Sequence, residues 1–333
     1  MFDFPPARRI RLPERHLPSG ERAAEITLSV HEAGQGPAIV LCHGFPELAY
    51  SWRHQMLALA QAGFHVIAPD QRGYGASDAP ASVDEYGLEY LTGDLDALLT
   101  VLGIERAVFA GHDWGGFVTW AMPVMYPERV AGLIGVNTPY VPFPTTDLLR
   151  KAFTEDERLY ILWFQQLGVA EAVLDRDPRL VFEKLMCGAA PIRADMYQAG
   201  RAGADANPFR RLDAMKPVGP ALLSDAEIEV YAKAYARNGF RGPINWYRNV
   251  DRNRARFPDA STRPLALACL MITAEWDAAL PPSMAKHMPS LLSDLEMHMI
   301  PGCGHWTQHD KPEELNQLMV DWLKRRFPTA RGS

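Results

Sequence analysis

Short clusters of apolar residues alternate with amphipathic stretches through the first half of the chain. Five such runs are EITLSV (25–30), AIVLC (38–42), HVIAP (65–69), AVFAG (107–111) and LIGVN (133–137). Because apolar residues follow one another in these runs, each is expected to be a strand buried on both faces, as parallel strands are. Between two of them, residues 88–103 place leucines at helical spacing. Alternating strands and helices predict an α/β protein with a doubly wound, mostly parallel sheet.

That alternation stops after Pro139. Residues 140–255 read as helical and rich in aromatic side chains, strand-like runs return at 267–275 and 295–301, and a helical pattern at 313–327 follows them. The simplest organisation is one α/β core interrupted by a helical lid insertion. The predicted parts are an N-terminal arm (1–24), the first part of the core (25–139), the lid (140–255) and the second part of the core (256–333).

Composition and sequence patterns limit the binding partners and the cell compartment that we expect for this chain. The arm is rich in arginine and proline but lacks the apolar stretch of a secretory signal, so we expect a flexible arm lying on the body. The net charge is −6, which gives no reason to expect nucleic acid. No apolar run approaches the roughly 20 residues of a membrane helix, so we expect no membrane association. The four cysteines lack C-x-x-C spacing, which favours a reducing cytoplasm.

The stretch AVFAGHDWGG (107–116) has the pattern of a sharp strand-to-helix turn that lifts its central residue above the sheet edge. The central residue is Asp113, where the pattern G-x-nucleophile-x-G usually has serine. A helix N-terminus would favour its ionised carboxylate. Taken alone, D-W-G-G is better explained by a helix N-cap.

Other motifs support a nucleophile. HGFPE (43–47) follows a predicted strand and can direct the Phe45 N–H at Asp113, while the Trp114 N–H supplies a second donor to an oxyanion hole. Asp277 ends a later strand, and His305 lies in GCGHW. The order nucleophile, acid, histidine is that of a hydrolase in which His305 activates water and Asp277 orients it.

Two further histidines lie beside these motifs. We expect His112 to be scaffold and His309 to lie on the surface. The chain has no GxxxxGK[ST], no HExxH and no clustered Cys/His ligands, so we expect neither a cofactor nor a metal.

A carboxylate nucleophile suits an sp³ carbon that bears a leaving group. Displacement leaves an alkyl–aspartyl ester, which activated water then hydrolyses. A halide needs only weak donors such as indole N–H, whereas an epoxide oxygen needs an acid, and a tyrosine hydroxyl is protonated at neutral pH. Three functions therefore remain possible for the chain at this point: that of an epoxide hydrolase, that of a dehalogenase and that of a non-catalytic small-molecule receptor.

Four motifs together resemble the α/β-hydrolase epoxide hydrolases of the soluble type, and the resemblance extends from about residue 25 to the C-terminus. These motifs are HGFPE, DQRGYGASD, GHDWGG and NGFRGPINWYRN. The resemblance implies an α/β-hydrolase fold, catalysis by Asp113, Asp277 and His305, and two lid tyrosines, Tyr160 and Tyr231, that hold the epoxide oxygen. Spacing alone could not choose Tyr231 over Tyr235 or Tyr247.

The same resemblance implies a substrate pocket between the lid and the core. We expect this pocket to be lined by Phe45, Trp114 and Trp163. The expected partners are a small apolar epoxide and water, and the chain could be a monomer or a homodimer.

Overall fold

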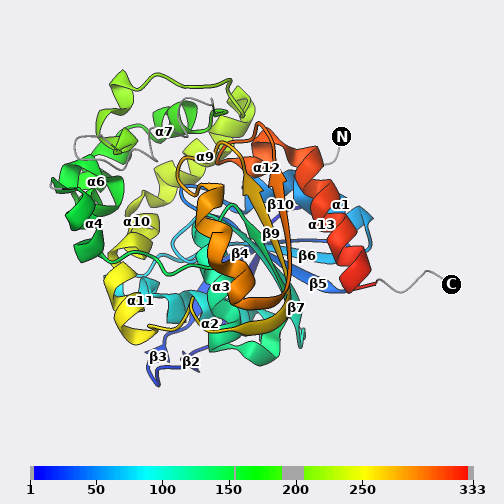
Figure 1. Cartoon of the computed structure of the whole chain (residues 1–333). Coiled ribbons are helices and arrows are strands. Elements are labelled where there is room, and N and C mark those ends of the chain that lie inside the picture. Colours follow the sequence, from blue (N-terminus) through cyan, green and yellow to red (C-terminus); the bar gives the residue numbers. More distant parts are fainter. Residues whose placement is uncertain (1–3, 154, 190–205, 329–333) are drawn as a thin grey trace.

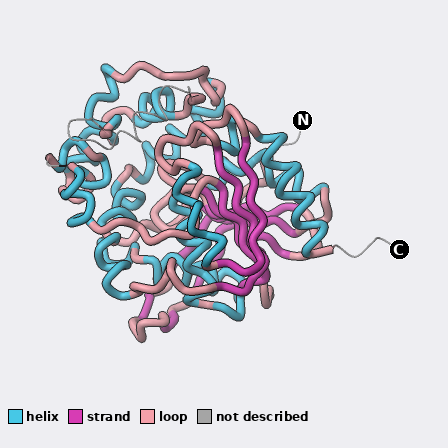
Figure 2. The backbone as a smooth tube through the Cα atoms, in the orientation of Figure 1, coloured by secondary structure: helices cyan, strands magenta, loops and turns pink. Residues whose placement is uncertain are grey.

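The computed structural model describes residues 4–153, 155–189 and 206–328. An eight-stranded sheet crosses the molecule in the order β1-β4-β6-β5-β7-β8-β9-β10, with helices on both sides (Figures 1 and 2). The strands from β6 to β10 in this order are parallel, and β4 and β1 are added antiparallel at one edge. This arrangement confirms the predicted mostly parallel α/β sheet. The strands are β1 (Arg8–Leu12), β4 (Ile26–Ala33), β5 (Ala38–Cys42), β6 (His65–Asp70), β7 (Ala107–His112), β8 (Val130–Val136), β9 (Leu265–Ala274) and β10 (Leu292–Ile300).

Each face of the sheet carries its own hydrophobic cluster. On one face, α1 and α13 pack through Met56, Leu59, Met319 and Trp322. On the other face, α2 and α3 pack through leucines, Val118 and Met122. The strands between these layers are apolar on both sides because neither face meets water. The covering helices are α1 (Arg53–Gln61), α2 (Leu88–Val101), α3 (Trp114–Met125), η6 (Pro282–Ser290), α12 (Thr307–Asp310) and α13 (Pro312–Arg326).

Between β8 and β9 the described chain is built mainly of short helices, which we call the helical segment. They gather on one side of the sheet (Figure 1). They fall almost wholly within the predicted range 140–255, with α11 ending one residue beyond it. They are α4 (Thr146–Ala152), α5 (Tyr160–Trp163), α6 (Val169–Leu174), α7 (Pro178–Leu185), η5 (Pro208–Ala214), α9 (Asp225–Asn238), α10 (Arg241–Arg248) and α11 (Val250–Arg256).

The N-terminal arm is more ordered than the expected flexible arm. Strand β1 pairs antiparallel with β4 and becomes the edge of the main sheet. Ile10 and Leu12 are buried while the arginines around them are exposed, which is the two-residue alternation of a half-buried strand. Further along, Glu21 forms an ion pair with Arg256 of α11, so the arm joins the core to the helical segment.

Among the helices in the described part of the chain, none combines the length and apolarity needed to cross a bilayer.

Candidate active site

The turn between β7 and α3 holds Asp113 in an unusual backbone conformation. Its φ is 50° and its ψ is −121°, a region that residues other than glycine rarely adopt. A side chain on Gly115 would meet the carbonyl oxygen of Cys42 at 2.0 Å, so only glycine lets α3 approach the neighbouring strand this closely. The Thr138 hydroxyl donates to the Asp113 carbonyl at 2.8 Å. The surrounding packing thus maintains a strained turn, which projects the Asp113 carboxylate away from the carboxyl ends of the strands.

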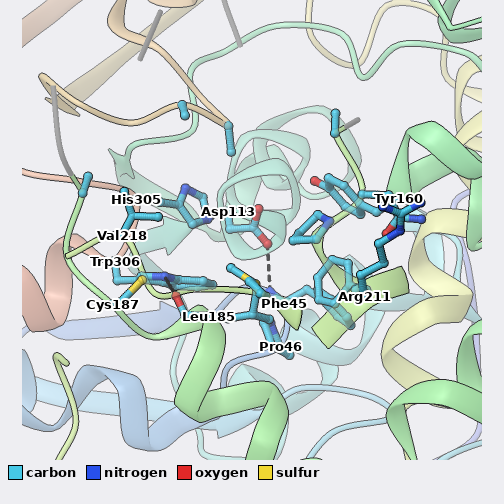
Figure 3. A pocket seen from close by; sticks show the side chains of 18 of the residues that line it. Phe45, Pro46, Asp113, Tyr160, Leu185, Cys187, Arg211, Val218, His305 and Trp306 are labelled. Atoms are coloured by element: carbon cyan, nitrogen blue, oxygen red, sulfur yellow. Dashed lines mark hydrogen bonds and ion pairs between the residues drawn. The ribbon is translucent and has the colours of Figure 1, made fainter. Parts of the chain in front are cut away.

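The Asp113 carboxylate is buried but supplied with donors. The backbone N–H of Phe45 donates to Oδ1 at 2.8 Å, the contact drawn in Figure 3. Burial is the largest influence on the pKa of Asp113 and raises it. The charge of His305 and the backbone N–H groups of Phe45 and Trp114 act in the opposite direction. Gly44 lets the donor loop approach, because a Cβ there would lie 2.4 Å from that of Asp113.

His305 lies between two carboxylates. Its Nδ1 is 2.9 Å from Oδ2 of Asp277, and its Nε2 is 3.8 Å from Oδ2 of Asp113. Asp277 is fully buried, and its Oδ1 accepts the backbone N–H groups of Ala279 and Leu280 at 2.8 and 2.9 Å. The three side chains predicted as nucleophile, acid and histidine are therefore brought together in one chain of contacts.

The charges at this site shift the pKa values of Asp277 and His305 in opposite directions. Burial would raise the pKa of Asp277, but the charge and hydrogen bond of His305 outweigh it and lower that pKa to about 2. Burial would lower the pKa of His305, but the charge and hydrogen bond of Asp277, and then the charge of Asp113, raise it to about 9. Since the pKa of His305 lies above neutrality, its imidazole carries the proton at neutral pH.

A cavity of about 470 Å³ opens over Asp113. In Figure 3, Asp113 lies near the middle, His305 and Trp306 lie on one side, and Tyr160 and Arg211 lie on the other. Residues that follow the carboxyl ends of strands form one wall and the helical segment forms the other. The lining side chains are mostly apolar and include Phe45, Pro46, Leu185, Pro208, Phe209, Met215, Val218, Trp276 and Trp306.

Among the described residues, two tyrosines line this cavity, and one of them differs from the sequence prediction. Tyr160 lines it as expected, but Tyr231 does not; Tyr247 of α10 does. The rings of Tyr160 and Tyr247 lie 5.7 Å apart at 78°. Tyr231 instead bonds its hydroxyl to Ser51 at 2.8 Å and stacks on Phe182. The Tyr231 side chain therefore packs α9 onto the core. For Tyr247, burial raises the pKa of the hydroxyl well above its ordinary value, which keeps this hydroxyl protonated.

The expected aromatic lining is also corrected. Phe45 lines the cavity, whereas Trp114 and Trp163 do not. Trp114 stacks on Phe143 with the two ring planes at 19°, beneath the cavity wall. Trp163 is buried beside Phe164. The Trp114 indole also packs on Tyr247 of α10, so it fills the junction between the core and the helical segment, while the contact of Trp163 with Phe164 lies within the helical segment.

Two histidines support the site from behind. His112 is buried, with Nδ1 2.8 Å from Glu47 and Nε2 2.7 Å from the carbonyl oxygen of His305, a scaffold position as expected. His309 was expected on the surface, but its side chain is fully buried, with Nδ1 2.9 Å from Arg53. Burial, followed by the charge of Arg53, lowers the pKa of His309 to about 3, so it is neutral.

A family model described as "alpha/beta hydrolase fold" matches residues 37–312. The chain therefore belongs to the α/β hydrolases. It is 39% identical over 306 residues to Epoxide hydrolase A of Mycobacterium tuberculosis, covering 90% of this chain and 94% of that protein. On that likeness it belongs, more narrowly, to the epoxide hydrolase family.

Other relatives agree with this assignment. Bifunctional epoxide hydrolase 2 of Sus scrofa is 41% identical over 306 residues, which cover 90% of this chain and 53% of that protein. The chain thus spans about half the length of the mammalian relatives it matches. The crystal structure of Epoxide Hydrolase A from Mycobacterium thermoresistibile superimposes with a TM-score of 0.82 at 35% identity, covering 96% of this chain and 98% of that one. These likenesses favour neither the dehalogenase nor the receptor alternative.

Proposed function

We propose that the protein is an epoxide hydrolase that opens a small, largely apolar epoxide to a vicinal diol through an ester on Asp113. The observation that carries the proposal is the division of labour between the two Asp113 oxygens. Oδ1 accepts the Phe45 N–H at 2.8 Å, while Oδ2 is directed at the His305 side of the cavity, 3.8 Å from Nε2. One oxygen is held by a donor, and the other is left to attack.

In the first step, Oδ2 of Asp113 attacks one epoxide carbon and the bond from that carbon to the ring oxygen breaks. The electron pair goes to the ring oxygen, which becomes strongly basic and needs a proton. Tyr160 and Tyr247 line the cavity opposite the nucleophile, and one of the two hydroxyls supplies that proton while the other donates a hydrogen bond. The product of this step is a hydroxyalkyl ester of Asp113 and a tyrosinate.

In the second step, water attacks the ester carbonyl carbon. Before this attack the resting imidazolium gives up its proton to neutralise the tyrosinate, so Nε2 of His305 is free to take a proton from that water. Negative charge develops on Oδ1, where the N–H groups of Phe45 and Trp114 stabilise it. The bond from the carbonyl carbon to Oδ2 then breaks, and His305 returns its proton to the departing alkoxide. The new Asp113 carboxylic acid passes its proton to His305, which restores the resting imidazolium. Asp277 stabilises the imidazolium throughout.

One turnover in ¹⁸O-water tests the proposal. With protein in excess over styrene oxide, the first diol should contain no ¹⁸O, because its new oxygen comes from Oδ2. The peptide that contains Asp113 should gain one ¹⁸O. Asp113→Ala serves as the control and should form no diol. Label in the diol of the first turnover would exclude the ester route.

A further inference from the structure

Asn137 follows β8 directly and is the second non-glycine residue with positive φ in the described chain, after Asp113. Its φ is 62°, in the left-handed region that asparagine tolerates better than most residues. The residue is buried, and its backbone N–H still donates to Ile272 of β9 at 2.8 Å. The chain therefore turns sharply at the end of the strand, beneath the catalytic carboxylate.

The side-chain amide of Asn137 contacts both loops that carry the predicted acid and base. Nδ2 donates to Oδ2 of Asp277 at 2.6 Å and lies 3.4 Å from the carbonyl oxygen of Gly304. The hydroxyl of Thr307 donates to Oδ1 of Asn137 at 2.7 Å. Because an ionised carboxylate only accepts hydrogen bonds, Asp277 keeps the NH₂ group of Asn137 directed at it, and the Thr307 hydroxyl then donates to the amide oxygen.

The oxygen that Asn137 contacts is the one that His305 uses. Oδ2 of Asp277 accepts from Asn137 and lies 2.9 Å from Nδ1 of His305, while Oδ1 accepts two backbone N–H groups. Asn137 is thus the fourth donor to a fully buried carboxylate. It stabilises the anion without adding a charge, and together with the other three donors it fixes the rotamer of Asp277.

We propose that Asn137 is a positioning residue for the second step of the reaction. It acts through Asp277, which holds the His305 ring in the direction needed to take a proton from water. It does not line the cavity, so it does not touch the epoxide. This inference rests on the proposed function, because it assigns a role within the hydrolysis of the Asp113 ester.

Two substitutions separate the amide from the backbone turn. Asn137→Gly keeps the left-handed conformation and removes the amide. Ester decay should slow by about 10- to 100-fold, the worth of one hydrogen bond to a charged group. Ester formation should stay close to the wild-type rate, since Asp277 takes no part in ring opening. Rapid quench followed by mass measurement of the protein gives both rates.

Asn137→Asp supplies a pH signature that a purely structural role would not produce. A carboxyl placed beside the Asp277 carboxylate retains its proton at low pH, because two like charges at this separation are unfavourable. In that form its O–H replaces the amide donor, and on ionisation the donor is lost. The ester should therefore decay faster in Asn137→Asp than in Asn137→Gly at about pH 6, and this advantage should disappear by about pH 9.

Asn249→Gly is the matched control. Asn249 is equally buried, and its Nδ2 donates to the carbonyl oxygens of Val83 and Asn245, away from the site. This variant should lose stability and keep the wild-type ester decay. If Asn137→Gly fails to fold, Thr307→Val tests the same idea, since loss of the hydroxyl that donates to Asn137 Oδ1 weakens the hold on the amide and should slow ester decay several-fold.

The outcomes separate this inference from the proposed function. If the wild-type protein forms no ester, the proposed function fails. If the ester forms and both Asn137 variants hydrolyse it at the wild-type rate, or their rate ratio does not change with pH, only the role of Asn137 is overturned.

Discussion

Esterification of Asp113 should itself switch His305 from acid to base. In the resting protein the pKa of His305 is raised to about 9, and the nearby Asp113 charge contributes to that rise. The ester carries no charge, so this contribution disappears when the first step is complete. With His305 Nε2 and Asp113 Oδ2 3.8 Å apart, an effective dielectric constant of about 20 gives an interaction of about 4 kcal/mol, or a factor of about 10³ in proton affinity.

Losing that interaction should bring the pKa of His305 from about 9 down to about 6. A raised pKa means that the proton is held below pH 9, so His305 is an imidazolium while Asp113 attacks. After esterification the lowered pKa releases the proton near neutrality, when a base is required. The protein would thus produce its base only after the ester has formed.

Asp113→Asn imitates the uncharged ester without chemistry. The titration of His305, followed by NMR of histidine-labelled protein, should move from a midpoint near 9 to one near 6. In wild-type protein, the rate of ester decay should rise with pH through the same lower midpoint. The reasoning is refuted if the titration in Asp113→Asn remains near 9, or if ester decay accelerates only above that pH.

Three further predictions follow from named contacts. Tyr160→Phe and Tyr247→Phe should each slow ester formation by about 10²-fold, whereas Tyr231→Phe should leave it unchanged, as measured by rapid quench; equal losses in all three would contradict the cavity assignment. His305→Gln should form the ester and fail to hydrolyse it, so the intact protein should gain the mass of one epoxide, and lost activity without that adduct would assign His305 another task. Leu12→Ala should reduce the free energy of unfolding by about 2–5 kcal/mol in urea, while a change within error would mean that β1 is not part of the folded core.

The sheet could be predicted because its strands are unusually uniform. In β5, residues 39–42 are fully buried, so both faces are apolar and the run stands out in the sequence. Strand β1 was missed because three of its five residues are arginine. Its signal was the alternation that buries Ile10 and Leu12, which is weaker over five residues than a continuous apolar run.

The residues of the candidate site could likewise be predicted only in part. Asp113, Asp277 and His305 each follow a strand, and parallel strands bring their carboxyl ends to one edge of a sheet, so the motifs alone placed them together. The tyrosines depend on how helices of the helical segment rotate and pack. In α9, Tyr231 and Tyr235 lie one turn apart on a buried face, and nothing in their spacing shows that this face meets the core instead of the cavity.

His309 shows the limit of local context. Its neighbours Asp310 and Lys311 are polar, so the local sequence gives no sign that His309 is buried. The short helix α12 turns His309 inward, where it contacts Arg53 of α1. That contact joins positions 256 residues apart, which no local pattern can indicate.

The link between Glu21 and Arg256 has a consequence for how the protein could be re-engineered. In the proposed mechanism, the groups that cleave the ester come from loops at the strand ends. The hydroxyl groups that would open the ring come from α5 and α10 of the helical segment, which the arm contacts through α11. Replacing the helical segment with that of a relative could therefore change which epoxides enter, while the loops that would activate water stay intact. Such a chimera would need the acceptor's own first two dozen residues matched to its new α11, since that ion pair is one of the contacts that cross the boundary between old and new parts.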